Sequence, residues 1–562
     1  SWQLNSLCAA VEALHGSPRM LLRWRQQWAP SPAAPVLLAL VAFCVGDNPL
    51  VPGAGMADPH IHIFGNEAYL YSTRDKSPHS TDFEMPGWDV WRSSDLVHWD
   101  HLTAISPQQT YIGKQPANAT RARVRTDDEF VRFAYSGALA CFAADVIARN
   151  GVYAFFFSNG DTNMGVMTAS SPSLSDAVDA IGGPLVSTEA LPTVPPGVTV
   201  TDRTHGAYDP TLLLDEDGVA YVCFGLQRPA DHGAGKPSSY LLARLSTSLT
   251  EIAETPRPLE FLPHPHTGKL FPGADKSTLH KRQGTYYLSS GTHYATSTSV
   301  YGPYTYRGDT VGTHQSQSFG LTGQAHGRFF EWRGQWFHVY CLFVDNNAAE
   351  KVSSRKSFFR ESWITYTHYG RDGEMVDDWK FLALHGKTGV GRYDASWPKI
   401  EAEWYTGATA CEKVQADAHH SGVLPPSSFA VRLSGAASSL LFSNVENLPH
   451  SATLTLAMRG IAAGGTIRVH STRDPDGPVL ATCPLRGAGS TVTCAFARGG
   501  QQGGTDGLRF TFEPPAGAAQ ALLLRMSQLA PEEALAGAEV ELDWWSLVGA
   551  HDDEAEAAVA GA

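Results

Sequence analysis

Five β-hairpins that recur along the chain constrain its fold more than any other feature. Each runs from an opening residue through a β segment and a tight turn to an aromatic pair about eleven residues later. The segments are DPHIHIFGNEAYLY from Asp58, FAADVIARNGVYAFFF from Phe142, DPTLLLDEDGVAYVCF from Asp209, DKSTLHKRQGTYYL from Asp275 and HGRFFEWRGQWFHVY from His326. Hairpins at intervals of roughly 50–85 residues, with further β segments between them, predict an all-β chain that contains a five-bladed β-propeller.

The opening residues of these hairpins predict a shared site. Equivalent hairpins of a propeller start at the same end of the innermost strands, where they meet at the mouth of the central channel. Asp58, Asp209, Asp275 and His326 would then lie in one pocket. An aspartate ahead of a strand is most often a turn residue that bonds to its own backbone. Four titratable groups at equivalent places favour a functional site, because a structural role would not require them to meet.

Three carboxylates in one pocket suit the hydrolysis of a glycosidic bond. That reaction needs one carboxylate that takes a proton from water and one protonated carboxyl that gives a proton to the leaving oxygen. A third carboxylate can raise the pKa of the acid by like-charge repulsion. The three aspartates therefore match three roles.

The net charge narrows the range of partners. Lys and Arg number 42 against 56 Asp and Glu, which leaves a formal charge of −14. This balance argues against nucleic acid and against an anionic membrane, and it suits a neutral ligand. We expect a monomer that acts on a polysaccharide or oligosaccharide and requires no cofactor, with a structural calcium ion left open.

Further motifs follow one family's pattern in order. They are ADPHIHIF, WRSSDLVHWDHL at 91–102, CFAADVIARNGVYAFFF, AYDPTLLLDEDGVAYVCFG, YGPYTYRG at 301–308, QAHGRFFEWRGQWFHVY and FFRESWITYTHYGRDGEM at 358–375. Over about residues 56–376 the chain resembles glycoside hydrolase family 43. The resemblance implies a five-bladed propeller that hydrolyses xylosides or arabinofuranosides with inversion.

The resemblance also implies roles for single residues. Asp58 corresponds to the general base, and Asp209 to the group that orients the acid and tunes its pKa. Arg360 resembles the arginine that reaches the bound sugar. His326 resembles the axial histidine that helps to hold a water-ligated metal ion, often calcium, or the base.

Two positions depart from the family pattern. Where members usually have Trp-Ala-Pro in the second blade, Phe142 would form the aromatic floor, and Asp275 stands where the acid glutamate is expected. Asp275 could be a working acid after a small backbone shift, or His280, Glu84 or Glu350 could supply the proton. Alternatively, the protein binds sugar with impaired catalysis, since losing the general acid costs about 10²–10⁴-fold in rate.

Aromatic and histidine side chains near the first hairpin have both functional and structural interpretations. Trp88 could contribute a sugar-binding platform, although a tryptophan in a β blade is more often part of the core. His60 and His62 alternate on one strand and could face the pocket. A zinc site there would need a third ligand, which the sequence does not indicate.

The composition changes on either side of the predicted propeller at 56–392. Within residues 1–55, Arg23 and Arg25 precede an apolar run, the order of a secretory signal, so we expect secretion. Alternating segments over 398–549 predict a β-sandwich, jelly-roll-like, after the propeller. IEAEWYTG at 400–407 and ELDWWSLV at 541–548 resemble a family 6 carbohydrate-binding module, and 550–562 form an acidic tail.

Overall fold

The computed structural model describes most of the chain between residues 48 and 549. The described ranges are 48–80, 83–114, 141–160, 163–187, 207–225, 240–273, 277–311, 326–344, 358–415, 429–459, 465–472, 478–485, 490–498, 505–515 and 539–549. The predicted leader falls almost wholly outside these ranges, and the acidic tail, Asp275 and Glu350 lie outside them entirely.

Five mostly antiparallel β-sheets follow one another from Met56 to Asp377. The first sheet holds β1 (Met56–Phe64), β2 (Glu67–Arg74), β3 (Gly87–Ser93) and β4 (Asp100–Ile105), and the second holds β5 (Cys141–Arg149), β6 (Val152–Asn159), β7 (Asn163–Ala169), β8 (Val178–Asp179) and β9 (Val186–Ser187). The third sheet holds β10 (Tyr208–Leu214), β11 (Ala220–Gly225), β12 (Tyr240–Arg244) and β13 (Arg257–Pro258), and the fourth holds β14 (Phe261–Leu262), β15 (Ser277–Arg282), β16 (Thr285–Ser290), β17 (His293–Ser297) and β18 (Tyr304–Asp309). The fifth sheet holds β19 (Gly327–Trp332), β20 (Gln335–Phe343), β21 (Arg360–Tyr369) and β22 (Met375–Asp377).

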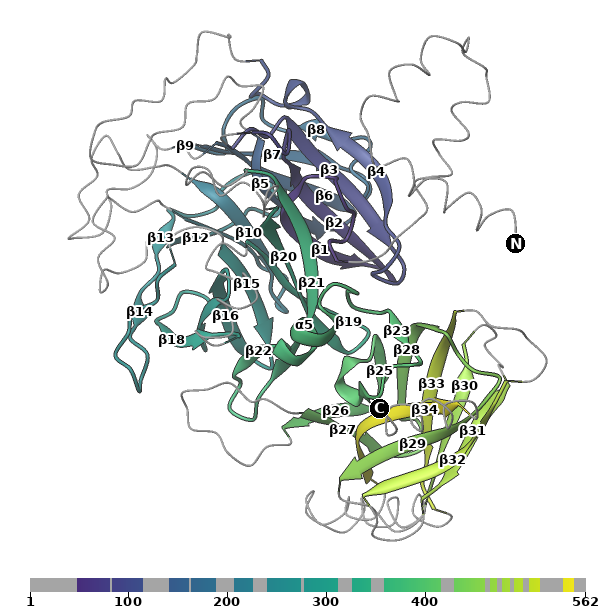
Figure 1. Cartoon of the computed structure of the whole chain (residues 1–562). Coiled ribbons are helices and arrows are strands. Elements are labelled where there is room, and N and C mark those ends of the chain that lie inside the picture. Colours follow the sequence, from purple (N-terminus) through teal and green to yellow (C-terminus); the bar gives the residue numbers. More distant parts are fainter. Residues whose placement is uncertain are drawn as a thin grey trace, which may run out of the picture. The chain divides into compact units, whose positions relative to one another are not determined.

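The innermost strands of the five sheets form a closed ring; in the fourth sheet this strand is β15, since β14 pairs with β18 at the outer edge. Strand β1 contacts β5, β5 contacts β10, β10 contacts β15, β15 contacts β19, and β19 returns to β1. Figure 1 shows these strands around a common centre, with the later strands of each sheet further out. The five recurring segments are the hairpins that begin with these strands. The prediction of an all-β fold with a five-bladed propeller is therefore confirmed.

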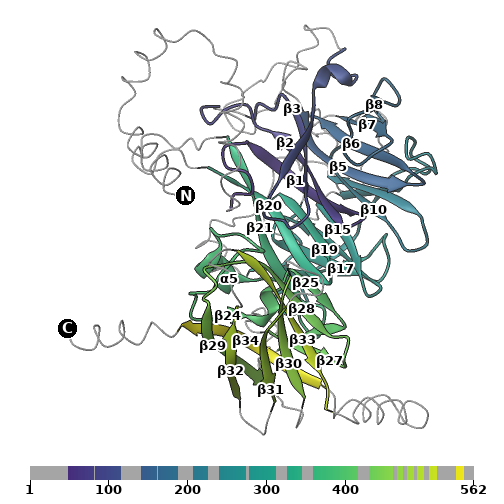
Figure 2. The same cartoon turned by 90° about the vertical axis from the view of Figure 1, so that its right-hand side faces the viewer.

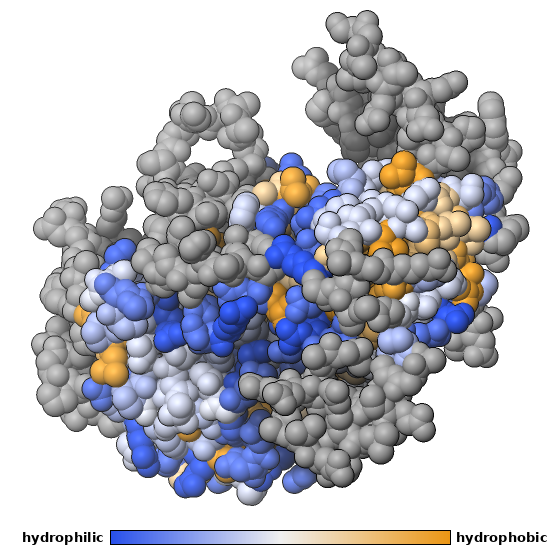
Figure 3. Space-filling model, turned by 90° about the horizontal axis from the view of Figure 1, so that it is seen from below, coloured by the Kyte–Doolittle hydropathy of each residue, from blue (hydrophilic) through white to orange (hydrophobic). Residues whose placement is uncertain are grey.

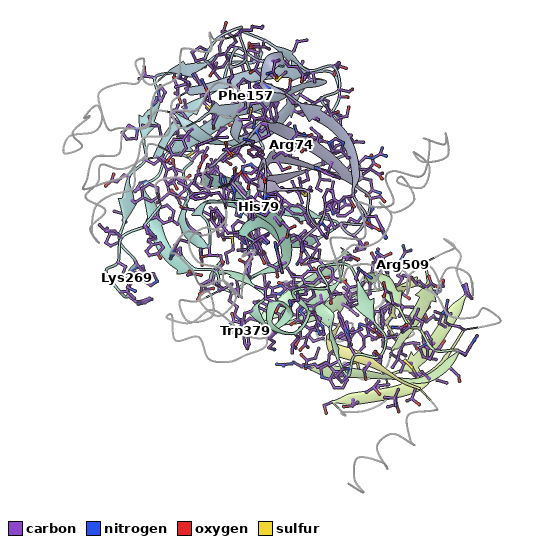
Figure 4. All side chains as sticks on the ribbon, turned by 45° about the horizontal axis from the view of Figure 1, so that its top comes forward. Arg74, His79, Phe157, Lys269, Trp379 and Arg509 are labelled. Carbon is purple, nitrogen blue, oxygen red and sulfur yellow. A yellow bond between two sulfur atoms is a disulfide. The ribbon has the colours of Figure 1, made fainter. Side chains whose placement is uncertain are left out.

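Apolar side chains between neighbouring sheets hold the blades together. Between the first and second sheets, Trp88 packs on Phe155 and on Phe157, which is labelled in Figure 4. Between the second and third sheets, Phe156 packs in one cluster with Leu212. Because both faces of a blade are covered, a run such as YAFFF of β6 is apolar at nearly every position.

Strands after the helix α5 (Trp379–His385) form a second β region. They are β23 (Tyr393–Asp394), β24 (Ile400–Glu401), β25 (Gly407–Thr409), β26 (Cys411–Gln415), β27 (Phe429–Ser434), β28 (Ser439–Glu446), β29 (Ser451–Arg459), β30 (Thr466–Ser471), β31 (Val479–Pro484), β32 (Thr491–Ala497), β33 (Asp506–Glu513) and β34 (Glu539–Gly549). The expected sandwich takes the form of one curled sheet, which Figure 2 shows from the side. Trp545 lies in its core, and a disulfide between Cys483 and Cys494 joins β31 to β32.

The face of the molecule in Figure 3 is mostly hydrophilic, with hydrophobic residues in small scattered groups. None of the helices in the described ranges is both long and apolar enough to cross a membrane.

Gly327 provides a test of how tightly the fifth blade is packed. A Cβ atom at this residue would lie 1.8 Å from the carbonyl oxygen of Val339 on β20. We expect Gly327→Ala to lower the free energy of unfolding by about 3 kcal/mol or more, because backbone must move to make room. Urea titration of the full chain measures this change.

Gly183→Ala is the matched control, since a Cβ atom there would meet nothing within 4 Å. Its expected effect is within about 0.5 kcal/mol. Equal effects of the two substitutions would contradict the packing argument.

Candidate active site

Asp58 and Asp209 reach the channel through the same backbone feature. Both have a left-handed backbone, with φ of 48° and 50°, and both are followed by proline. The pairing register shifts at this point, between Ala57 and His60 in β1 and at the equivalent place in β10. Such bulges redirect a side chain, and aspartate tolerates left-handed backbone better than most residues. The Asp-Pro pair thus turns each carboxylate out of the regular alternation of its strand.

Four of the predicted site residues come together near the start of the inner strands β1 and β10. His326 Nδ1 lies 3.1 Å from Asp58 Oδ1 and 3.9 Å from Asp209 Oδ2. Arg360 Nη1 donates a hydrogen bond of 2.6 Å to Asp58 Oδ1. The side chains of Asp58, His326, Asp209 and Arg360 are only 5%, 5%, 10% and 8% exposed. The structure therefore places a carboxylate pair, a histidine and an arginine in one largely desolvated cluster.

Asp75 holds Arg360 in place and was not found by sequence reasoning. Arg360 donates from Nε to Asp75 Oδ2 at 3.0 Å and from Nη2 to Oδ1 at 2.8 Å. Its backbone N–H donates to Oδ2 at 2.8 Å as well. This bidentate pair leaves Nη1 directed at Asp58. Asp75 follows strand β2 without any motif around it, so no signal in the sequence marks it.

The environment keeps Asp58 ionised. Burial favours the protonated form of this carboxyl, but the charge of Arg360 and then that of His326 outweigh burial and hold its pKa below the usual range. Burial raises the pKa of Asp75 to about 6, although Arg360 opposes the shift. Both carboxylates are therefore charged at neutral pH, and Asp58 can accept a proton.

Phe142 belongs to an aromatic group beside this cluster. Phe83 lies 4.7 Å from Phe358, 6.2 Å from Phe343 and 6.5 Å from Phe142 between ring centroids. The guanidinium carbon of Arg360 lies 5.0 Å from the Phe83 centroid. All four rings are partly exposed, so they can offer apolar surface next to the buried charges.

Trp88 lies elsewhere, in the core between the first two blades. Its exposed fraction is 0%, and its indole N–H donates to the carbonyl of Phe142 at 2.8 Å. The expectation that Trp88 contacts sugar is corrected in this respect: the ring is covered by apolar neighbours, and it supports the backbone of Phe142 instead. The alternating sequence pattern of a β-strand cannot show whether an aromatic side chain is exposed or buried between blades, because both faces of a blade are covered by neighbouring blades.

The proton donor is not identified by the described residues. Asp275 lies outside them; Ser277, which opens β15, donates from Oγ to the carbonyl of Asp209 at 2.9 Å. His280 is buried against Tyr287 and 2.8 Å from the Tyr369 hydroxyl, and burial lowers its pKa to about 3. It is neutral at neutral pH, and its ring packs among Tyr287, Phe329 and Trp336, which disfavours it as the acid.

Glu84, another alternative donor, is engaged outside the Asp58 cluster. It accepts hydrogen bonds from Lys76 Nζ and Ser80 Oγ, both at 3.1 Å. Glu350 lies outside the described ranges.

A possible metal-binding group lies on the inner strands. His60, His62 and Asp145 offer ligand atoms within 4.8 Å of one another, and no other described residues form a set of three. Asp145 completes this set of three, and the sequence did not indicate it. His326, the predicted metal ligand, is not in this group.

This group does not fit calcium. Calcium takes 6–8 oxygen ligands in proteins, and the group supplies one carboxylate. Asp145 Oδ2 already accepts from Arg328 Nη1 at 2.9 Å and from the Leu212 N–H at 2.7 Å. Its Oδ1 accepts from the Val146 N–H at 2.8 Å. The cation at this place is a guanidinium, so we derive no chemistry from calcium here.

The inner strands of this five-bladed propeller gather carboxylates at one end, an arrangement that suits glycoside hydrolysis. A model of the glycosyl hydrolases family 43 matches residues 46–373, more than half of the chain. The chain belongs to this family and is a glycosidase. Enzymes of this family need no organic cofactor. The match ends before the C-terminal sheet.

Curated relatives agree with this assignment. The chain is 26% identical over 376 residues to a xylosidase/arabinosidase of Bacteroides ovatus, covering 58% of this chain and 96% of that protein. It is 27% identical over 323 residues to an arabinoxylan arabinofuranohydrolase of Bacillus subtilis, covering 52% of this chain and 57% of that protein. A Bacillus subtilis arabinoxylan arabinofuranohydrolase crystallised with cellotetraose is similar at 19% identity and a TM-score of 0.45, covering 89% and 97% of the two chains.

Asp75→Asn tests whether Arg360 needs its carboxylate anchor. We expect kcat/KM on an aryl glycoside to fall about 10–100-fold, because Arg360 would no longer hold Asp58 in place. In the wild-type protein, kcat/KM should fall as the pH drops below about 6, where Asp75 becomes protonated. The variant should lack this decline, since it has no such ionisation.

Asp89→Asn is the control for this variant. Asp89 is a buried carboxylate of the same blade, paired with Arg74 at 3.3 Å and His101 at 3.0 Å. Its replacement should leave both rate and pH profile unchanged. Wild-type kinetics in Asp75→Asn would contradict the role given to Asp75.

Proposed function

We propose that the protein releases arabinofuranosyl or xylosyl units, with inversion, from plant or algal polysaccharides or oligosaccharides. One observation carries the proposal: Asp58 is an ionised, desolvated carboxylate, held by Arg360 and His326 beside a second carboxylate, Asp209. The relatives named as xylosidase/arabinosidase and arabinoxylan arabinofuranohydrolase support a pentose-containing substrate.

Asp58 acts as general base in this proposal. It takes a proton from the water that attacks the anomeric carbon, and Arg360 keeps its carboxylate oriented for that transfer. Inversion requires about 6.5–9.5 Å between the base and acid carboxyls, which leaves room for the water. Asp275 is the proposed acid on the family pattern, with Asp209 raising its pKa by like-charge repulsion.

Phe83, Phe142 and Phe358 provide the proposed contact for the sugar. Aromatic rings pack against the apolar C–H face of a sugar, and these rings stand next to Arg360. A compact pentose can therefore have one face on the rings and its polar groups toward the charged cluster.

The C-terminal curled sheet is proposed to be a carbohydrate-binding module. Sugar binding needs an exposed aromatic ring on a stable core, and β34 supplies one tryptophan for each. Trp545 is fully buried, whereas Trp544 is partly exposed, with Lys399 Nζ 5.5 Å from its ring centroid. We further propose that the protein is secreted and acts as a monomer, which agrees with a polymeric extracellular substrate.

Proton NMR on arabinoxylan-derived oligosaccharides, alongside an aryl arabinofuranoside, tests the proposal. The wild-type protein should release sugar of inverted anomeric configuration from both substrates. Asp58→Asn should lose about 10²–10⁴-fold on both, because the base is removed. Asp275→Asn should lose a similar factor only on the oligosaccharides, since an aryl leaving group needs little protonation. Asp89→Asn again serves as the control.

Other outcomes would separate the alternatives. A retained anomeric configuration would contradict the assignment of Asp58 as base. Wild-type turnover of the aryl substrate alone would indicate a working base without an acid. No turnover of either substrate, with binding to oligosaccharides preserved, would favour a sugar-binding protein.

A further inference from the structure

We infer that the guanidinium of Arg328 takes the place of a metal ion on the inner strands of the propeller. There it holds His60 and Asp145 in the arrangement that positions His326 against Asp58. The inference rests on the proposed function for its catalytic part only. It makes Arg328 a positioning residue, and it predicts a propeller that works without a divalent cation.

Arg328 joins three blades through its guanidinium. From β19 of the fifth blade, Nη1 donates to Asp145 Oδ2 of the second blade at 2.9 Å. Nη1 also lies 3.4 Å from Thr211 Oγ1, and Nη2 donates to the carbonyl of Leu212 at 3.2 Å, both on β10 of the third blade. A bound metal ion would link inner strands in the same manner, by collecting oxygen atoms from several of them.

Asp145 has no oxygen left for a metal ion. Besides Arg328, its carboxylate takes the backbone N–H groups of Leu212 and Val146. His62 Nε2 lies 2.5 Å and His60 Nδ1 lies 3.0 Å from Oδ1. Two carboxylate oxygens offer about four acceptor positions, and five groups already approach them. A metal ion could bind only after Arg328 or a histidine moved away.

The charges around Asp145 are already balanced. The pair of Arg328 and Asp145 has no net charge, with side chains 10% and 0% exposed. A divalent cation would add two positive charges beside a buried guanidinium, which is unfavourable at low dielectric.

His60 and the chain itself connect this pair to the catalytic cluster. The His60 ring stands edge-on to the His326 ring, with centroids 5.8 Å apart and an angle of 70° between planes. His326 precedes Arg328 by two residues. Gly327 between them lies so close to Val339 that it cannot carry a side chain. A shift of Arg328 would therefore be transmitted to His326 and from there to Asp58.

Metal analysis of the wild-type protein is the first test and does not depend on activity. Plasma mass spectrometry should find far less than one equivalent of any divalent metal after purification without chelator. The melting temperature and kcat should be the same in EDTA and in added Ca²⁺. Stoichiometric metal, removed by EDTA together with stability or activity, would overturn the inference. If the wild-type protein contains no metal and has no turnover, the proposed function is contradicted, but the inference that Arg328 replaces a metal ion is not.

Arg328→Ala tests the positioning role by chemical rescue. We expect kcat to fall about 100-fold with little change in KM, because the displaced residue is Asp58 and not the sugar contact. Millimolar guanidinium, or a divalent cation that enters the vacated space, should restore part of kcat. Arg328→Lys should retain more activity than Arg328→Ala, since it keeps the charge. A folded, metal-free Arg328→Ala protein with wild-type kcat would overturn the inference.

Arg498→Ala is the matched control for losing a buried arginine. Arg498 lies in the C-terminal sheet with Asp506 at 3.9 Å, and their side chains are as buried as the Arg328 pair. The control should lose stability without losing kcat, and guanidinium should not affect its rate. If Arg328→Ala does not fold, the wild-type metal content and the Arg328→Lys kinetics decide the question.

Discussion

Ring closure between the last and first blades is the constraint on which the site depends. Strand β19 packs against β1, and the N–H of Asp58 donates to Cys341 Sγ of β20 at 3.4 Å. Only this closure brings the fifth blade's His326 and Arg360 to the first blade's Asp58. Closure also protects the edges of the innermost strands, because these edges then face one another around the central channel.

Two buried arginines offset the energetic cost of burying carboxylates inside the propeller. Arg360 forms ion pairs with both Asp58 and Asp75, and Arg328 balances the charge of Asp145. A buried carboxylate without such a partner would take up a proton, which would remove the base. The same ion pairs thus stabilise the ring of strands and keep Asp58 in the state that glycoside hydrolysis needs. Stability and function are coupled because the charges sit where the blades meet.

Sequence reasoning found the residues that carry a local signal. Asp58, Asp209 and His326 each open a recurring hairpin, and Arg360 lies in a motif of the family, so all four were predicted. Asp75 and Arg328 were missed because their partners are remote: Asp75 pairs with Arg360 across 285 positions, and Asp145 pairs with Arg328 across 183. Trp88 was misplaced because a blade buries both faces, so alternation no longer marks the exposed side.

The sequence by itself determined the five hairpins, the all-β class, the family and the residues at the start of the inner strands. These follow from turn residues, β periodicity and motif order, all of which are short-range patterns along the chain. The tertiary structure decided which charges pair, that a guanidinium lies beside Asp145, and that Trp88 is core. Those outcomes depend on distances between blades that are far apart in sequence, and local patterns carry no information about such distances.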